Sequence, residues 1–188
     1  MAAVYPFVVD LVTRRAGESS GLLEVGCGAM QYADHVPGRY QGLDLPGSRY
    51  VRGQPHLVGS VEEIPAPDAM FDVVFGVAAF YYVDDVVGAF RECHRVLRPG
   101  GSLLVFDYNR ETIEQLIAEG DREAMHAWDA QELRARIRAG GFRGGRIRDR
   151  SHWARGSGSQ APLRRAARKV AAAVRPAASQ WLILEARR

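Results

Sequence analysis

The stretch Leu22-Leu23-Glu24-Val25-Gly26-Cys27-Gly28 decides the fold of this chain. A short apolar run that ends in Gly-x-Gly predicts a buried strand and then a tight turn, where the backbone can approach a ligand closely. Asp44 lies twenty residues beyond Glu24 and closes a second predicted strand at 40–43. An acidic side chain at that place can accept both hydroxyls of a ribose, so the pattern indicates a nucleoside-containing cofactor.

Strands and helices alternate outward from this stretch, which is typical of an α/β sheet with helices on its faces. One helix is predicted from Asp84-Asp85 to the break at 98–101, and another from Asp129, which forms an acidic capping box with Glu132. The remaining strands are predicted at 56–58, 71–75, 102–106, 146–150 and 181–185. We therefore expect a doubly wound α/β fold with a seven-stranded, mostly parallel sheet.

The length of 188 residues favours one domain over the whole chain, residues 1–188. Residues 151–179 interrupt the alternation, and we interpret them as a basic insertion before the last strand, with a loop over 155–160 and an amphipathic helix over 163–174. Residues 143–188 hold 12 Lys and Arg against two acidic residues, a net charge of +10, whereas residues 1–142 have a net charge of −7.

The basic helix has three open interpretations. In the first, its arginines form a solvated face above a packed apolar stripe. In the second, they cover the acceptor pocket and favour a phosphorylated or carboxylated substrate. The third interpretation is contact with RNA or with an anionic membrane surface. No aromatic platform for single-stranded bases accompanies the arginines, which disfavours RNA.

Several protein classes are excluded by composition. Cys27 and Cys93 are too few for a disulfide framework or a structural zinc site, and no histidine stands in a metal-binding pattern. The apolar start at 4–12 precedes Arg14-Arg15, which reverses the order found in a signal peptide. The apolar stretch at 70–83 is too short to span a bilayer. We expect a cytoplasmic protein without a membrane span or a bound metal.

The glycine turn does not match a dinucleotide-binding site. That fingerprint has a third glycine at position 31, where this chain has Gln31, and Met30 replaces the glycine that allows close helix packing. A pyrophosphate site is therefore disfavoured. Hydride-transfer enzymes that use a lysine are disfavoured too, because the single lysine, Lys169, lies in the basic insertion.

Five segments in a fixed order resemble the class I S-adenosylmethionine-dependent methyltransferases, of the compact small-molecule type. They are residues 22–28, 42–45, 59–65, 71–74 and 90–101, the last continuing into 102–105. The resemblance covers residues 20–150, and the ordered set is more specific than any one segment. Residues 181–186 resemble the family's final strand, which implies a Rossmann-like methyltransferase fold whose last strand is antiparallel.

The resemblance implies S-adenosyl-L-methionine as cofactor and S-adenosyl-L-homocysteine as its product. Gly26, Cys27 and Gly28 would pass beneath the methionine part, and Glu24 would fix the turn or bind the amino group through water. The other implied contacts are Asp44 with the ribose, Leu45 with the adenine face, Ser60 and Val61 with the adenine edge, and the carbonyls of Gly76 and Val77 with the methionine ammonium.

Two residues depart from the family's pattern. Ser60 stands where relatives commonly carry an acidic residue for the adenine amino group, and Met30 replaces the usual third glycine and narrows the turn. Both predict modest affinity for the cofactor, with a loss of activity as the alternative. Near the N-terminus, Tyr5 and Phe7 would either cover part of the cofactor or pack a short helix.

Methyl transfer from an activated sulfonium needs mainly alignment of the acceptor, and it needs a base only when the acceptor is protonated. Ligands bind beyond the carboxyl ends of the strands in open α/β sheets. That rule selects Tyr81, Tyr82, Asp107, Tyr108, Asn109 and His126. His126 is the best titratable candidate, with a hydrogen-bonded structural role as its competitor. Tyr82 and Asp107 are the other catalytic candidates, and an aromatic wall and a backbone anchor are their competing roles.

These observations predict a methyltransferase that acts on an oxygen or nitrogen of a small-molecule metabolite, in one interpretation an anionic one. Two alternatives remain: a catalytically silent module that binds the cofactor or a partner, and an RNA methyltransferase that uses the basic tail. Val77-Ala78-Ala79-Phe80 stands where enzymes that methylate nucleic-acid bases often carry Asn/Asp-Pro-Pro-Tyr/Phe. Nucleic acid is therefore the less favoured partner.

Overall fold

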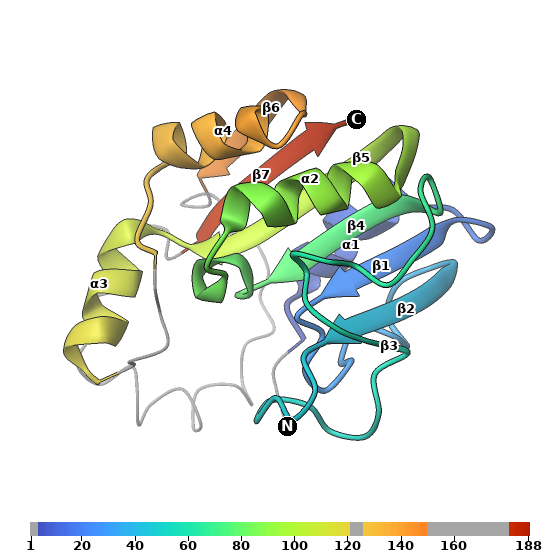
Figure 1. The fold of residues 1–188 in the computed structure, drawn as a ribbon, viewed down its shortest axis with the longest axis horizontal. Coiled ribbons are helices and arrows are strands. Elements are labelled where there is room, and N and C mark those ends of the chain that lie inside the picture. Colours follow the sequence, from blue (N-terminus) through green and yellow to red (C-terminus); the bar gives the residue numbers. More distant parts are fainter. Residues whose placement is uncertain (1–3, 121–125, 150–180) are drawn as a thin grey trace.

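The computed structural model describes residues 4–120, 126–149 and 181–188. They form a seven-stranded sheet in the order β3-β2-β1-β4-β5-β7-β6 (Figure 1). The strands are β1 (Gly21–Val25), β2 (Arg39–Asp44), β3 (Leu57–Val58), β4 (Phe71–Val77), β5 (Leu97–Tyr108), β6 (Arg143–Asp149) and β7 (Trp181–Arg187). Pairing is parallel from β3 through β5, whereas β7 runs antiparallel to both β5 and β6. The predicted fold class, with its antiparallel last strand, is confirmed.

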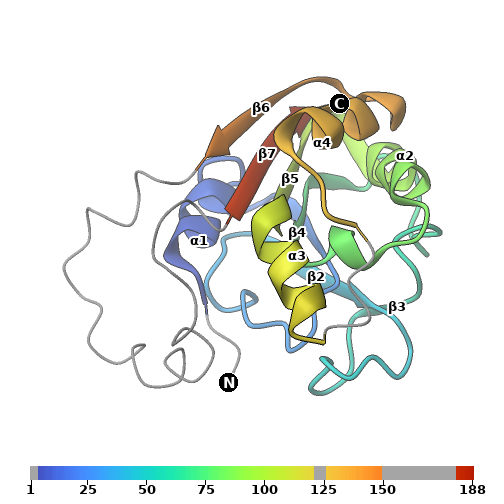
Figure 2. The ribbon, with the colours of Figure 1, turned by 90° about the vertical axis from the view of Figure 1, so that its left-hand side faces the viewer.

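Helices cover both faces of the sheet (Figures 1 and 2). On one face α1 (Pro6–Thr13) packs over the sheet, and on the other face α2 (Val86–Val96) packs beside α4 (Ala130–Ala139). The short 3-10 helix η1 (Phe80–Tyr82) follows β4, and α3 (Arg110–Ala118) follows β5. Both elements therefore lie next to the carboxyl ends of central strands, where the candidate site is expected.

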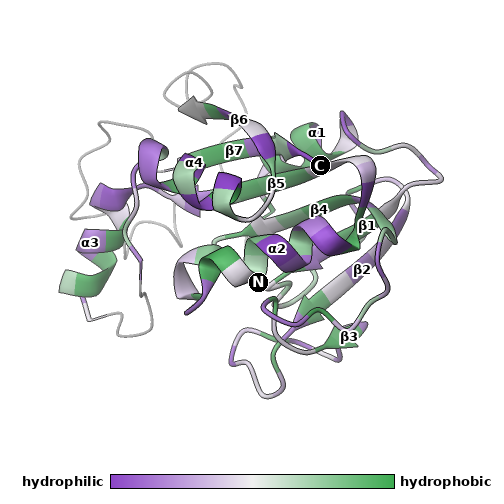
Figure 3. Cartoon of the chain, turned by 45° about the horizontal axis from the view of Figure 1, so that its top comes forward, coloured by the Kyte–Doolittle hydropathy of each residue, from purple (hydrophilic) through white to green (hydrophobic). Residues whose placement is uncertain are grey.

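Two apolar faces of the sheet follow from alternation along the strands. Leu22 and Val73 belong to the cluster under α1, whereas their neighbours Leu23 and Val74 belong to the cluster under α2 and α4. All four side chains are fully buried. Strands that are covered on both faces have continuous apolar sequences, and the strands of this sheet were predicted from such runs. Figure 3 shows the hydrophobic strands inside and the hydrophilic residues gathered on the helices and connections.

Helix caps are where the sequence predicted them. The Asp85 side chain accepts a hydrogen bond from the Gly88 N–H (2.9 Å) at the start of α2, and Asp129 and Glu132 form the predicted capping box of α4. The end of α2 differs from the prediction. The helix stops at Val96, and the break at 98–101 already belongs to β5, whose Leu97 pairs with Phe71.

The helix α3 was not predicted. Asn109, considered above for the acceptor pocket, caps this helix through a hydrogen bond from the Thr112 N–H (3.0 Å). Only Ile113 of α3 is fully buried, so no repeating apolar stripe marks the helix in the sequence.

The basic insertion at 151–179, with its predicted loop and helix, lies outside the described residues, and the single domain 1–188 stays a prediction. The strand predicted at 146–150 corresponds to β6. Within the described ranges, no helix has the length and apolar character needed to cross a membrane.

Candidate cofactor and active site

The turn after β1 is held between two neighbouring strands. Gly26 and Gly28 have φ angles of 65° and 50°, in the left-handed region that glycine adopts without strain. A Cβ on Gly26 would lie 2.7 Å from the Cβ of Ala79, so a larger residue does not fit. The Cys27 N–H donates to the carbonyl of Leu43 near the end of β2 (3.1 Å). The turn therefore presents bare backbone at the carboxyl edge of the sheet, the kind of surface that a ligand can approach closely.

Asp44 joins the end of β2 to this turn. Its Oδ2 accepts a hydrogen bond from the Gly28 N–H (2.7 Å), and its Oδ1 accepts one from the Leu45 N–H (2.8 Å). Each carboxylate oxygen keeps a lone pair for a further bond. The neighbouring Leu45 is 54% exposed, which places a large apolar side chain beside a carboxylate. A nucleoside needs this combination, an apolar face for the base and an acceptor for two hydroxyls.

Glu24 lies within the sheet. Its carboxyl group accepts a hydrogen bond from the Tyr40 hydroxyl of β2 and is almost fully buried. Burial raises the pKa of Glu24 to about 8, so the carboxyl group is largely protonated near neutral pH. Of the two roles expected for Glu24, this placement favours fixing the strand end over contact with the methionine amino group through water.

Met30 adopts the left-handed conformation that a glycine would adopt freely. Its φ of 50° costs about 1–2 kcal/mol in a residue with a Cβ. A Cβ on Gly42 would lie 2.7 Å from the Cys27 Sγ and 3.1 Å from the Met30 Cγ, so both side chains pack over β2 at that glycine. Burial raises the pKa of the Cys27 thiol to about 12, which keeps it protonated. The expected narrowing of the turn by Met30 stays a prediction.

Ser60 and Val61 follow β3, and the end of β3 lies beside the end of β2, where Asp44 stands. Val58 of β3 pairs with Asp44, and the Gly59 N–H donates to the Asp44 carbonyl (3.0 Å). The Ser60 hydroxyl accepts a hydrogen bond from the Glu62 N–H (3.1 Å). These bonds bring the residues expected at the adenine edge close to the residue expected at the ribose.

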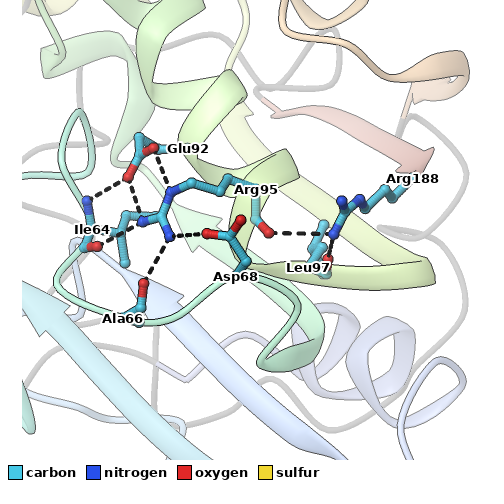
Figure 4. A network of polar contacts seen from close by, with 7 residues as sticks. All are labelled: Ile64, Ala66, Asp68, Glu92, Arg95, Leu97 and Arg188. Atoms are coloured by element: carbon cyan, nitrogen blue, oxygen red, sulfur yellow. Dashed lines mark hydrogen bonds and ion pairs between the residues drawn. The ribbon is translucent and has the colours of Figure 1, made fainter.

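Arg95 of α2 binds residues 64–68, the segment that follows Ser60 and Val61 (Figure 4). Its guanidinium pairs with both carboxylate oxygens of Glu92 (2.7 Å each) and donates to the carbonyls of Ile64 (2.9 Å) and Ala66 (2.8 Å). It also forms an ion pair with Asp68 (2.8 Å). The hydrogen bonds from Arg95 hold the pKa of Glu92 below its ordinary value. We call these five residues the Arg95 clamp.

The Arg95 clamp was not foreseen from the sequence. Glu92 and Arg95 form an i, i+3 pair that is common on helix surfaces and gives no sign of partners about thirty residues away. The C-terminal Arg188 adds to the clamp, because its guanidinium donates to the carbonyls of Arg95 (3.3 Å) and Leu97 at the end of α2.

Gly76 and Val77 end β4 beside the glycine turn. Gly76 pairs with Val25, the residue before Gly26. A Cβ on Gly76 would lie 2.7 Å from the ring of Phe80, so glycine lets the chain fold back over the strand end. The last carbonyls of β4 therefore lie next to the turn, and their contact with a methionine ammonium stays a prediction.

Asp107 anchors the chain where it leaves β4. Its Oδ1 accepts a hydrogen bond from the Ala79 N–H (3.1 Å), and the preceding residue, Ala78, has a strained φ of 52°. Asp107 is fully buried, and burial raises its pKa to about 7. Its Oδ2 has no hydrogen-bond partner in the part of the chain that the structure describes. The bond to Ala79 matches the backbone-anchoring role, and a catalytic role stays a prediction.

A row of aromatic rings crosses the carboxyl edge of the sheet. Successive ring centroids lie 4.2 to 6.3 Å apart in the order Tyr5, Trp181, Tyr108, Tyr81, Tyr82 and Tyr50, which we call the aromatic row. Burial raises the pKa of Tyr81 and of Tyr108 above the ordinary value, so both phenols stay protonated and form neutral walls. Phe7 packs beneath Tyr5 and Trp181 and is 5% exposed, which favours its helix-packing role.

His126 lies beside the aromatic row. Its backbone N–H donates to the Tyr81 carbonyl (3.2 Å), and its imidazole stacks on the Trp128 indole with centroids 5.3 Å apart. The His126 Nε2 is buried and has no hydrogen-bond partner within the described ranges. Both the role as a base and the structural role expected for His126 stay predictions.

Most of the expected cofactor residues thus meet at one edge of the sheet, at the ends of β1, β2, β3 and β4. They are Gly26, Cys27, Gly28, Asp44, Leu45, Ser60, Val61, Gly76 and Val77. The turn leaves no room for a side chain at Gly26, and the exposed Leu45 lies beside Asp44. This combination fits a nucleoside cofactor. Among the described residues, no three His, Cys, Asp or Glu side chains lie together so that they could hold a metal ion.

Known proteins share this combination of motifs and fold. Residues 23–105 match the model of a family described as a methyltransferase domain. A Mycolicibacterium smegmatis protein named "Probable S-adenosylmethionine-dependent methyltransferase" is 35% identical over 134 residues, 66% of this chain and 50% of that protein. The malonyl-[acyl-carrier protein] O-methyltransferase of Yersinia pestis is 32% identical over 104 residues, 50% of this chain and 39% of that protein.

The fold likeness extends over nearly the whole chain. The structure of the YcgJ protein of Bacillus subtilis has a TM-score of 0.65 at 18% identity, covering 97% of both chains, which shows the fold alone. The chain spans half or less of the length of the curated relatives named here. The matched domain, the ordered motifs and the sheet order together place the chain in the class I S-adenosylmethionine-dependent methyltransferase family.

Proposed function

We propose that this protein transfers the methyl group of S-adenosyl-L-methionine to an oxygen or nitrogen of a small molecule and releases S-adenosyl-L-homocysteine. The contact between Asp44 and Gly28 carries the proposal, because it joins the carboxylate expected at the ribose to the glycine turn, with the exposed Leu45 beside it. The matched methyltransferase domain supports the methyl donor. The sulfonium supplies an activated methyl group, so the protein's task is to hold donor and acceptor in line.

The glycine turn and the end of β4 would hold the methionine part, while Asp44 and Leu45 would hold the nucleoside. Ser60 would meet the adenine amino group with a hydroxyl that already accepts a hydrogen bond from Glu62. A neutral hydroxyl binds an amino group less strongly than a carboxylate does. We therefore expect a modest affinity for the cofactor.

The acceptor would lie against the aromatic row, with Tyr82 as a wall. His126 would take the proton from an acceptor that is protonated at the working pH, whereas a carboxylate acceptor would need no base. Asp107 would position the chain after β4 through Ala79. The relative from Yersinia pestis is named as an O-methyltransferase, which supports an oxygen acceptor.

Isothermal titration calorimetry with S-adenosyl-L-homocysteine tests the donor site. We expect the wild-type protein to bind, and Asp44→Ala to bind about 10- to 100-fold more weakly, since a hydrogen bond to a charged group contributes about 1.5–3 kcal/mol. Asp10→Ala is the matched control, because it removes an α1 carboxylate whose ion pair, among the described residues, is with the exposed Arg14 just after the helix. The absence of binding by the wild-type protein would refute the proposal.

Transfer is tested with S-adenosyl-L-methionine labelled in its methyl group and three acceptor panels: phenols and carboxylic acids, amines, and tRNA. Label on a small oxygen or nitrogen compound supports the proposal. Label on tRNA alone would establish the RNA alternative, and cofactor binding without transfer to any panel would favour the silent module.

A further inference from the structure

The connection from β2 to β3 contains a segment bounded by two glycines. Gly47 and Gly53 have φ angles of 74° and 91°, in the left-handed region. A Cβ added to either glycine would meet no atom within 4 Å, so neither is required by close packing. Glycines in open space provide backbone freedom, which suits hinges. We call residues 47–53 the strap.

Tyr50 stands in the middle of the strap and lies over the cofactor turn. A Cβ on Gly28 would lie 3.5 Å from both the Cβ and the carbonyl oxygen of Tyr50, so the backbone and the Cβ of Tyr50 lie directly against the turn. The Tyr50 hydroxyl lies 3.5 Å from the Tyr82 hydroxyl, and the two ring centroids are 6.3 Å apart. The strap therefore reaches from the end of β2 to η1 beyond the end of β4, across the carboxyl end of β1.

The contacts of the strap are those of a surface element. Tyr50 is 46% exposed, and its hydroxyl accepts a hydrogen bond from the Arg49 side chain of the same strap (2.7 Å). A half-exposed ring contributes little to the core, so stability of the fold does not explain why it lies over Gly28 and beside Tyr82.

We propose that the strap is a closing element of the cofactor site, with Tyr50 as a further positioning residue and Tyr82 as the group that it meets on closure. This inference rests on the proposed function, since the turn beneath Tyr50 is the one assigned to the methyl donor. The donor enters and leaves when the strap swings about Gly47 and Gly53, and Tyr50 holds it in place when the strap is closed. Tyr82 belongs both to this contact and to the aromatic row, so closure also completes the wall facing the acceptor.

The rate at which S-adenosyl-L-homocysteine leaves the protein tests the strap, measured by stopped-flow displacement with excess competitor. Tyr50→Ala should release the ligand about tenfold faster, since the exposed half of the ring, once buried against the ligand, contributes about one factor of ten. Tyr50→Phe keeps the ring and should release it nearly as slowly as the wild-type protein. Gln54→Ala, just outside the strap at an exposed position, should leave the rate unchanged.

Trypsin gives a readout that is independent of turnover. Arg49 and Arg52 are exposed strap residues, so cleavage after them, mapped by mass spectrometry, reports strap opening. We expect S-adenosyl-L-homocysteine to protect both sites in the wild-type protein, and to protect them less in Tyr50→Ala. The wild-type comparison with and without ligand needs no variant to fold.

The outcomes separate the two proposals. Two results would refute the closing role of the strap and leave the proposed function standing, provided that the wild-type protein binds the ligand. In the first, Tyr50→Ala releases the ligand at the wild-type rate. In the second, the ligand does not change trypsin cleavage after Arg49 and Arg52. If the wild-type protein does not bind the ligand, both are refuted.

Discussion

The hydroxyl of Tyr40 donates a hydrogen bond to the buried carboxyl group of Glu24 across the pairing of β1 and β2. Glu24 pairs with Gly42 in this register, so Tyr40 reaches it diagonally from two residues earlier on β2. Each group supplies the partner that the other needs inside the sheet. This contact fixes the ends of the two strands from which the glycine turn and Asp44 project.

The stability of the protein should depend on pH through Glu24. The pKa of Glu24 is about 8 in the folded protein, against an ordinary value of 4.5. The folded protein therefore binds more protons than the unfolded chain between these two pH values. Stabilisation from this group is complete below the ordinary pKa and is lost as the pH rises toward 8. Relative to Glu24→Gln, the wild-type free energy of unfolding should fall by up to about 4 kcal/mol between pH 5 and pH 8. Urea unfolding at several pH values measures it, and parallel curves for the two proteins would contradict the prediction.

Tyr40→Phe should destabilise the protein by about 1–3 kcal/mol, because it leaves the Glu24 carboxyl group buried without its donor. The matched control is Tyr32→Phe, which also removes a buried hydroxyl, but one whose partners are the Tyr5 N–H (3.4 Å) and the Gln31 side chain in place of a buried carboxyl group. A double-mutant cycle with Glu24→Leu gives the pairwise energy from urea unfolding. Additive losses within about 0.5 kcal/mol would show that the two residues do not depend on each other.

Two variants of Asp107 separate anchoring from proton transfer. Asp107→Asn keeps an oxygen that can accept the Ala79 N–H, so it should retain ligand binding and transfer. Asp107→Leu removes that acceptor, and we expect a loss of about 1–3 kcal/mol in stability together with weaker S-adenosyl-L-homocysteine binding. Calorimetry and a labelled-methyl assay on both variants give the comparison. A large loss of transfer in Asp107→Asn with intact binding would assign Asp107 to proton transfer instead.

The strands of the site could be predicted from local sequence, and the contacts across it could not. Residues 22–25 and 71–75 are apolar runs next to turn or cap residues, and these local signals suffice to place β1 and β4. By contrast, Arg95 reaches Ile64 and Tyr50 reaches Tyr82 across about thirty residues of chain. Such pairs depend on the order of strands in the sheet, which a propensity or a cap does not encode.

The Arg95 clamp should set the position of the segment after Ser60. We expect Arg95→Lys to lose about 1–3 kcal/mol of stability and to bind S-adenosyl-L-homocysteine more weakly, because an ammonium cannot reproduce the planar guanidinium fork. Asp68→Ala is the control within the clamp. Its side chain is 76% exposed, so its loss should cost less than about 1 kcal/mol. Thermal unfolding and calorimetry distinguish the two, and equal effects of both variants would contradict the assigned role.

His126→Gln should separate acceptors by their need for a base. Because a phenol must lose its proton on methylation, His126→Gln should methylate a phenol about 100-fold more slowly than the wild-type protein, the lower end of what a positioned base contributes. A carboxylate acceptor is already deprotonated, so both proteins should methylate it at the same rate. Both proteins should also bind S-adenosyl-L-homocysteine equally well. An unchanged rate on the phenol, or an equal loss of rate on the phenol and the carboxylate, would remove His126 from proton transfer.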